Sequence, residues 1–277
     1  MGRVMCVAFP LVALVVVSMC YGMADAEVKT QNLRWHYYKV TNTCRDAEEY
    51  VRHQVNLFWK NDRSITAKLL RLVYADCFVT AGGPGYPVLT GRKDGMKSDA
   101  ASVDLPSPSV LQQKVLEYFK SRNLNEVDMT TLLGAHTMGR THCSFIVDRL
   151  YNYNGSGKPD PSMSATFLES LRKLCPPRKK GQADPLVYLN PESGSSYNFT
   201  ESYYGRILSH ETVLGVDQQL LYSDDTKQIS EEFAVGFEDF RKSFATSMYK
   251  MGNYRVLTGN QGEIRRYCRY TNKGNPN

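Results

Sequence analysis

Histidines are the first side chains in this chain to consider as metal ligands or catalytic groups. His136 lies in an apolar helical stretch beside Gly134. From the residues alone, a hydrogen-bonded core histidine is the stronger interpretation, and a metal ligand is the alternative. His142 does not complete a zinc site, because a separation of six residues puts the two rings on opposite faces of a continuous helix. A zinc enzyme or a nucleophilic hydrolase is therefore disfavoured.

The elements that must position these histidines are predicted to be mainly helices, because apolar residues recur with helical spacing. In residues 46–59, apolar side chains recur every three or four positions, which predicts a helix with one buried face. A second helix is predicted over 65–79, and 184–197 is predicted to be an ordered loop. The other predicted helices span 110–121, 126–138, 164–174, 200–208, 230–251 and 262–266. No stretch has the composition of a linker, so one all-α domain with two helical lobes around a cleft is expected.

The first residues predict export. Arg3 precedes an apolar stretch over 7–19, and Ala24-Asp25-Ala26 follows. This is the layout of a secretory signal peptide over residues 1–26, which leaves a mature domain of 27–277. We expect a secreted protein, extracellular or in the cell wall, with no membrane span. Two sequons, at Asn154 and Asn198, suit a glycoprotein.

Charge and cysteine content narrow the possibilities further. The formal charge is +6, and the basic residues are spread along the chain, so no nucleic-acid partner is expected. Signal-peptide removal would leave five of the seven cysteines. An odd number cannot pair completely within the chain.

Several segments, taken together and in order, resemble plant class III haem peroxidases. They are LLRL (69–72), DCFV (76–79), GGP (82–84), GRKDG (91–95), LPSP (105–108), LGAHTMGRTHC (133–143), VDQQL (216–220) and parts of 251–268. The resemblance runs from about Leu33 to Arg269. It implies a two-lobed helical fold with haem between a distal and a proximal half.

The resemblance also implies roles for individual residues. His136 would be the axial ligand of haem b, and Asp217 would accept a hydrogen bond from its other ring nitrogen. Gly134 would let the flat macrocycle approach the backbone. Arg71 would be the distal cation, and small phenolic donors would bind near Pro106. The implied activity is reduction of hydrogen peroxide by a monomeric enzyme, which contributes to peroxide removal, the oxidative-stress response and wall phenolic oxidation.

Two departures from the family pattern concern the distal half. The family's distal base is a histidine four residues after the arginine, but this chain has Ala75, whose methyl group cannot carry a proton. The family also has a long helical stretch where only Thr80-Ala81 separates Val79 from Gly82. Of the distal calcium ligands, Asp76 and Val79 would remain.

The resemblance implies further metal and disulfide sites. A proximal calcium ion would take oxygen ligands from Thr137, Asn190, Ser195 or Ser196, and Thr200, with neutral groups where carboxylates are expected. By family pairing, Cys143–Cys175 is the one disulfide left whole. The partners of Cys44, Cys77 and Cys268 would lie in the missing stretch.

Four functions are compatible with these residues. The first is a class III peroxidase whose activity the distal changes impair. The second is a haem-binding pseudoenzyme, and the third is a truncated isoform, from splicing or a gene model, without function. A secreted helical interaction protein is the fourth, but it leaves the pairing of His136 with Asp217 unexplained.

Overall fold

The computed structural model describes residues 33–70, 83–97, 99, 104–179, 181–195, 197–267 and 269–274. Within these ranges the chain is mostly helical, with one small two-stranded sheet, so the all-α prediction is confirmed. None of the helices described is long and apolar enough to cross a membrane. The predicted signal peptide, residues 1–26, lies outside the described ranges.

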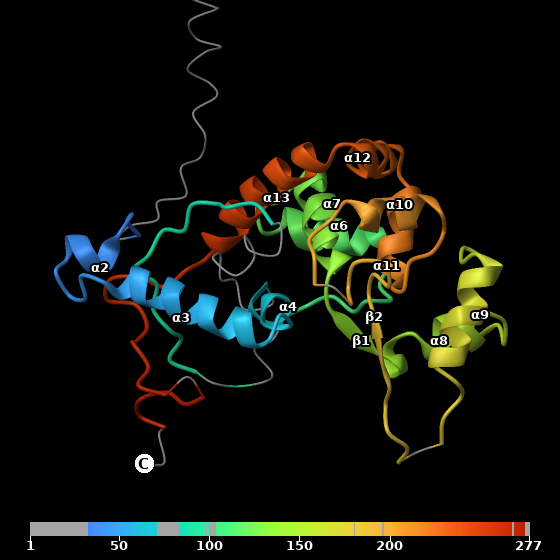
Figure 1. The fold of residues 1–277 in the computed structure, drawn as a ribbon, viewed down its shortest axis with the longest axis horizontal. Coiled ribbons are helices and arrows are strands. Elements are labelled where there is room, and N and C mark those ends of the chain that lie inside the picture. Colours follow the sequence, from blue (N-terminus) through green and yellow to red (C-terminus); the bar gives the residue numbers. More distant parts are fainter. Residues whose placement is uncertain are drawn as a thin grey trace, which may run out of the picture.

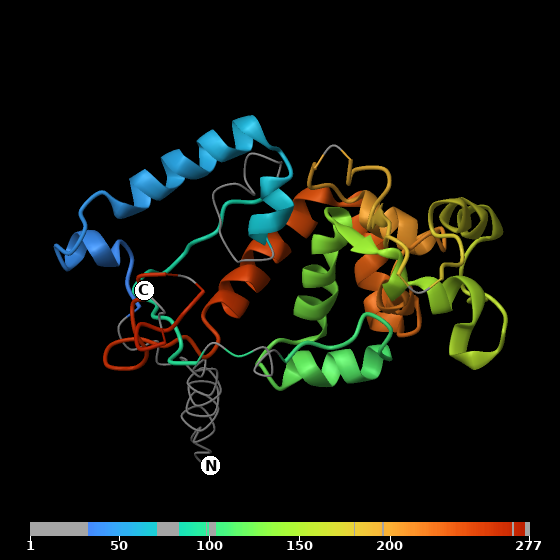
Figure 2. The same cartoon turned by 90° about the horizontal axis from the view of Figure 1, so that it is seen from below.

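A helical core forms the centre of the molecule (Figures 1 and 2). It consists of α6 (Gln112–Lys120), α7 (Glu126–Leu133), α10 (Ser202–Leu208), α11 (Gly215–Gln218), α12 (Asp224–Val235) and α13 (Phe237–Gly252). The long helix α13 packs along α7, and α12 packs on α7 and α10.

Aromatic side chains fill the space between these helices. Phe199 stacks on Phe240 with ring centroids 4.6 Å apart, and Tyr204 meets the edge of Phe240 at 5.0 Å. Phe244 and Phe233 complete the cluster, and all five side chains are buried. Burying such large apolar surfaces is the main favourable contribution to folding this half of the chain.

A second group of short elements flanks the core. It contains α8 (Val147–Tyr151), α9 (Ala165–Leu174), β1 (Arg140–His142) and β2 (Leu186–Tyr188). The two strands pair antiparallel, with Thr141 opposite Val187. Among the described residues, the 3-10 turns η3 (Cys143–Phe145) and η4 (Tyr153–Gly155) contact α8, whereas η2 (Gly134–Thr137) and η5 (Gln219–Leu221) contact helices of the core.

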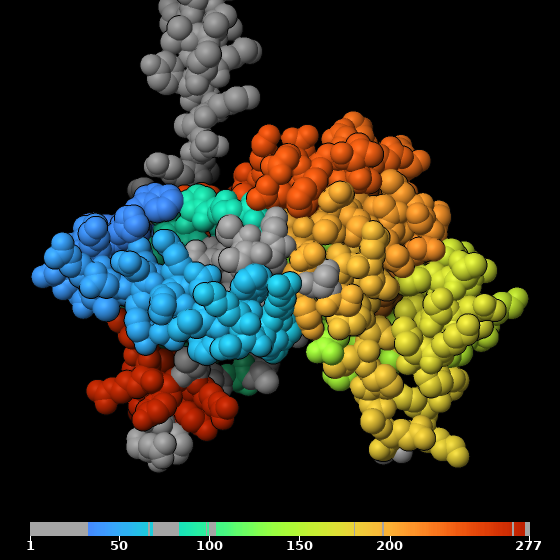
Figure 3. Space-filling model, viewed as in Figure 1, coloured from blue at the N-terminus to red at the C-terminus, as the bar shows by residue number. Residues whose placement is uncertain are grey.

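The N-terminal helices lie to one side of the core. They are α2 (Tyr37–Val40), α3 (Ala47–Asn61) and α4 (Ile65–Leu70). Helix α3 forms where it was predicted, but the prediction of a buried face is wrong, because none of its residues is buried. Tyr50 is 65% exposed and Phe58 is 56% exposed. Figure 3 shows this segment, in blue, spread over the surface.

Isolated bridges connect the chain around this side. Arg34 pairs with Thr90, Lys93 with Leu257 and Asp94 with Glu263. The last bridge corrects the predicted helix at 262–266, which is extended backbone and turn instead. Because Asp94 and Glu263 exchange two backbone hydrogen bonds, this segment is held as a bridge rather than coiled.

Other predicted boundaries also need correction. The single helix predicted at 230–251 is two helices, α12 and α13, which meet at Gly236 with φ −112° and ψ 69°. A side chain there would approach the Glu232 carbonyl oxygen at 2.9 Å. The loop predicted at 184–197 includes strand β2. Of the helix predicted at 65–79, residues 71–79 lie outside the described ranges.

Candidate active site

Helix α7 leads the chain into the site. Its start is fixed by a capping box, in which the Asn125 side chain accepts from the Asp128 backbone N–H and the Asp128 carboxylate accepts from the Asn125 N–H. Asp128 also accepts hydrogen bonds from Ser247 and Lys250 of α13. The beginning of α7 is therefore tied to the longest helix of the core, which makes α7 a rigid support.

The helix tightens into the 3-10 turn η2 at Gly134. A side chain at this position would come within 2.6 Å of the Phe240 ring and of the Tyr204 hydroxyl. The glycine is thus required for close packing against the aromatic core. This corrects the expectation that its missing side chain makes room for a macrocycle.

His136, in turn η2, is paired with Asp217. Its Nδ1 lies 2.9 Å from Asp217 Oδ1, across 81 residues of sequence. The Asp217 side chain is 2% exposed and the His136 side chain is 28% exposed. The aspartate is therefore held inside the protein, whereas the imidazole is partly exposed. The pairing expected from sequence is present.

Electrostatics favour a proton on Nδ1 of this imidazole. Burial alone would lower the pKa of His136, but the negative charge of Asp217 and its hydrogen bond outweigh burial and raise the pKa. The carboxylate also fixes the tautomer, because Nδ1–H donates to Oδ1. The other ring nitrogen, Nε2, makes no hydrogen bond to a described residue.

Tyr203 is a neighbour that sequence reasoning missed. Its ring lies edge-on to His136, with centroids 6.4 Å apart. Burial, and then the charge of Asp217, hold the pKa of the Tyr203 hydroxyl well above its usual value, so the phenol stays neutral beside the pair. In the sequence, Tyr203 lies in a predicted helix and has the pattern of an ordinary core residue, so nothing indicated that it contacts His136.

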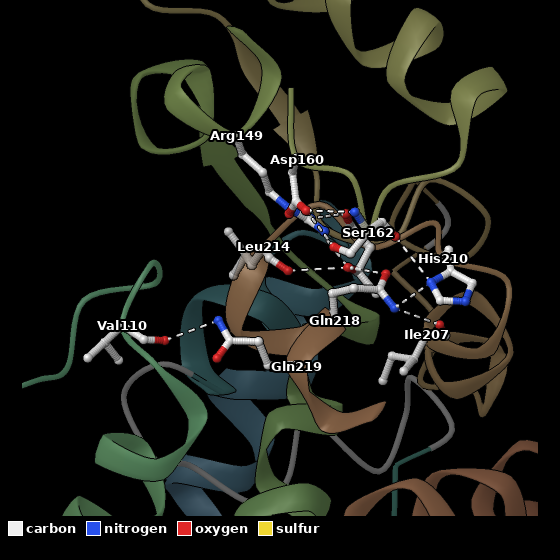
Figure 4. Close-up of polar contacts among 10 residues, drawn as sticks. Val110, Arg149, Asp160, Ser162, Ile207, His210, Leu214, Gln218 and Gln219 are labelled. Atoms are coloured by element: carbon white, nitrogen blue, oxygen red, sulfur yellow. Dashed lines mark hydrogen bonds and ion pairs between the residues drawn. The ribbon is translucent and has the colours of Figure 1, made fainter. Parts of the chain in front are cut away.

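A buried polar network fixes the short helix that carries Asp217 (Figure 4). Gln218 donates to the Ile207 carbonyl at 3.0 Å and accepts from the Thr212 hydroxyl at 3.1 Å. Arg149 donates to the Thr212 carbonyl and pairs with Asp160, Nε to Oδ2, at 2.6 Å. A four-residue helix cannot hold its own orientation, so these bonds position α11.

Hydrogen bonds from the Gln219 side chain and the Val216 backbone extend this support to the predicted substrate turn. Gln219 donates to the Val110 carbonyl at 3.4 Å and accepts from the Gln112 N–H at 2.7 Å. Val216 N–H donates to the Pro108 carbonyl at 3.3 Å. The turn that contains Pro106 is thereby joined to the residues on either side of Asp217.

The predicted proximal calcium residues meet in part. Thr137 Oγ1 lies 3.0 Å from the Thr200 carbonyl oxygen, and Asn190 joins the same cluster by donating to Ser202 Oγ at 2.9 Å. Of the described serines in this loop, Ser193 rather than Ser195 reaches Thr137, with the two hydroxyl oxygens 3.1 Å apart. In the turn that follows Asn190, Ser193 is buried and Ser195 is exposed.

Other predicted sites can be located as well. Cys143 and Cys175 form the expected disulfide, and Cys44 is an exposed free thiol. Asn154 and Asn198 are both exposed, as attachment of a glycan requires. The remaining positions lie outside the described ranges: Arg71, Ala75, Asp76, Cys77, Val79, Ser196 and Cys268.

Comparison with known proteins decides the family. The peroxidase family model matches residues 79–236, more than half of the chain. Probable peroxidase 26 of Arabidopsis thaliana is 53% identical, over 87% of this chain and 90% of the relative. The chain belongs to the class III peroxidase family. Probable peroxidase 61 of the same plant is 51% identical, over 95% of this chain and 97% of the relative.

Membership in the class III peroxidases makes this chain an oxidoreductase by class. It implies haem as the cofactor, and hydrogen peroxide with an electron donor as the substrates. The His136–Asp217 hydrogen bond lies within the part of the chain that the peroxidase family model matches. The predicted family and fold class are confirmed.

The relatives have residues that this peroxidase lacks. The alignment with probable peroxidase 26 runs over 303 positions but takes in 87% of the 277 residues here, which is about 241. About 60 positions are therefore present in the relative and absent from this chain. Probable peroxidase 61 gives a similar excess, with 330 positions against 95% of the chain.

Proposed function

We propose that this chain is a secreted class III peroxidase that binds haem b through His136 and reacts slowly with hydrogen peroxide. The hydrogen bond between His136 Nδ1 and buried Asp217 is the observation that carries this proposal. When Nδ1–H donates to the carboxylate, the lone pair of Nε2 is available to a metal. The donor set therefore fits a haem iron.

Each residue on the proximal side has a defined task. Asp217 keeps His136 in one tautomer and makes its imidazole a stronger electron donor. The network through Gln218 keeps Asp217 in place. Bound haem would supply the redox-active iron at which hydrogen peroxide is reduced at the expense of a phenolic donor. We place that donor beside Pro106, at the turn joined to α11.

The distal side is the reason for slow turnover. Arg71 would stabilise the negative charge that develops on peroxide. Ala75 has no group that can accept a proton from one peroxide oxygen and deliver it to the other. General acid–base catalysis is worth about 10²–10⁴-fold, so the rate should fall by a factor in that range.

A haem-binding pseudoenzyme or a truncated, non-functional isoform is the second candidate. The roughly 60 positions missing relative to probable peroxidase 26 support it. We place the missing segment between Val79 and Gly82. The loss would remove the partners of three cysteines. It would also remove most of the distal calcium site, of which Asp76 and Val79 would remain.

Haem binding by the mature chain, residues 27–277, tests the proposal. We expect a Soret band on reconstitution with haem, its loss in His136→Ala, and its retention in His142→Ala. His142 is the matched control because it is a histidine of the same segment that binds the Asp184 carbonyl, Nδ1 to O, at 3.0 Å.

Guaiacol oxidation by the same samples separates the candidates. Slow turnover supports the impaired peroxidase, and haem binding without turnover supports the pseudoenzyme. A chain that does not fold with haem supports the non-functional isoform. An unchanged Soret band in His136→Ala would contradict the assigned ligand.

A further inference from the structure

Five polar residues beneath His136 form what we call the hydroxyl network: Thr137, Asn190, Ser193, Thr200 and Ser202. Two of its bonds connect turn η2 with the loop after strand β2. Thr137 Oγ1 donates to the Thr200 carbonyl at 3.0 Å, and Ser193 Oγ donates to the Thr137 carbonyl at 2.8 Å. Thr137, Asn190 and Ser193 are buried. The network thus ties down the residue that follows His136.

The remaining polar groups of the network are also paired. Thr200 Oγ1 and Ser202 Oγ share a hydrogen bond at 2.7 Å. Asn190 Nδ2 donates to Ser202 Oγ at 2.9 Å, while its Oδ1 accepts from the Glu192 backbone N–H at 3.0 Å. The backbone N–H fixes which side of the Asn190 amide is oxygen, so the NH₂ group faces Ser202.

Calcium does not fit this set of donors. Ca²⁺ is bound by oxygen lone pairs, usually with carboxylates that offset its double charge, and its affinity falls with ligand charge. None of the five residues is acidic, and Asn190 directs an N–H donor rather than an oxygen toward Ser202. Within the described ranges, no group of three or more histidine, cysteine or acidic side chains is placed to hold a metal ion. A cation bound by these five side chains would receive no counter-charge from them and would break their existing hydrogen bonds.

We propose that the hydroxyl network takes the place of the family's proximal calcium ion, so that the support beneath His136 is independent of metal. Direct hydrogen bonds hold the loop 190–202 against turn η2, where the ion would otherwise cross-link them. The hydrogen bonds of Thr137 and Ser193 join the same two segments that such an ion would join.

Thermal unfolding of the mature chain with excess EGTA, and again with millimolar calcium, tests this proposal. We expect the wild-type midpoint to be the same in both buffers. The double variant Asn190→Asp/Thr200→Asp should be less stable than wild type in EGTA, because it buries two carboxylates side by side. Calcium should then raise its midpoint by about 5–10 °C, the size expected for a ligand well above its Kd in a chain of this length.

Ser195→Asp is the matched control. It adds a carboxylate to the same loop, but at an exposed position outside the network, so calcium should leave its midpoint unchanged. A double variant that gains no response to calcium would show that the network does not stand in place of an ion site. If calcium raised the midpoint of Ser195→Asp as much as that of the double variant, the assignment of Ser193 rather than Ser195 to the network would be contradicted.

A wild-type midpoint that rises with calcium is the result that overturns the proposal, provided that Thr200→Val removes the rise. If the midpoint of Thr200→Val still rises with calcium, the ion binds elsewhere in the chain, and the hydroxyl network is metal-free, as proposed. The readout is stability rather than peroxide turnover. Its outcome is therefore distinguishable from success or failure of the proposed function.

Discussion

At the scale of single residues, Gly134 and His136 make different contacts although only two positions separate them. His136 turns its ring to Asp217, while Gly134, two residues earlier, presses its backbone on Phe240 and Tyr204. The motif LGAHTMGRTHC (133–143) identified both residues in the sequence, but it did not show that one packs against the core and the other pairs with a carboxylate. Spacing alone could not predict the partner of His136, because 81 residues separate the pair.

Gly134→Ala should destabilise the protein, although alanine favours helical backbone. Its methyl carbon would meet Phe240 and Tyr204 at 2.6 Å in a closely packed core, which costs about 1–3 kcal/mol. Gly205→Ala is the matched control, because no atom lies near enough to obstruct its methyl group, and it should be neutral or stabilising. Urea unfolding measures both. Equal stability of the two variants would refute the packing role of Gly134.

At the scale of elements, the short helix α11 depends on groups far away in sequence. Gln218 binds Thr212, Thr212 binds Arg149, and Arg149 binds Asp160. The sequence identified VDQQL as a motif but gave no sign that Arg149 and Asp160 support it. Such contacts depend on tertiary packing rather than on local pattern, so only the structure reveals them.

Asp160→Asn should lower the free energy of unfolding and alter its dependence on pH. Burial would raise the pKa of Asp160, but hydrogen bonds from Ser162 and Arg149 outweigh burial and lower it. The ionised carboxylate thus stabilises the fold above about pH 4, and this contribution is lost as the pH falls through its folded pKa. Breaking the buried pair should cost about 3–5 kcal/mol at neutral pH.

Denaturant unfolding across the acid range checks this prediction. The wild type should lose stability below about pH 4 more steeply than Asp160→Asn. Asp239→Asn is the control, since Asp239 pairs with Lys242 at 3.8 Å on the surface and should change stability by less than about 1 kcal/mol. Parallel acid profiles for wild type and Asp160→Asn would contradict the account.

Element boundaries show where sequence patterns stop being informative. The periodicity of α3 predicted a helix correctly, because it reports local structure, but a buried face also needs a partner, which the pattern does not contain. The junction at Gly236 was missed, because apolar residues continue on both sides of it. Strands β1 and β2 have three residues each, which is too few for alternation to be recognised.

At the scale of the whole molecule, the two sides of the fold differ in completeness. The side that carries His136 and Asp217 has a continuous aromatic core, a disulfide and buried polar networks. Helix α3, on the other side, has no buried residue. Relatives have about 60 more positions in their alignments, so an incomplete distal half is a consistent explanation for this asymmetry.

The most direct test of the account is the second-order rate constant for the reaction of the haem-loaded chain with hydrogen peroxide, measured by stopped-flow absorbance. His136→Ala mixed with haem provides the background from unligated cofactor. We predict a rate about 10²–10⁴-fold below that of a class III peroxidase with a distal histidine, because Ala75 cannot transfer a proton. A rate equal to that of such an enzyme would contradict the central claim of an intact proximal side joined to a disabled distal one.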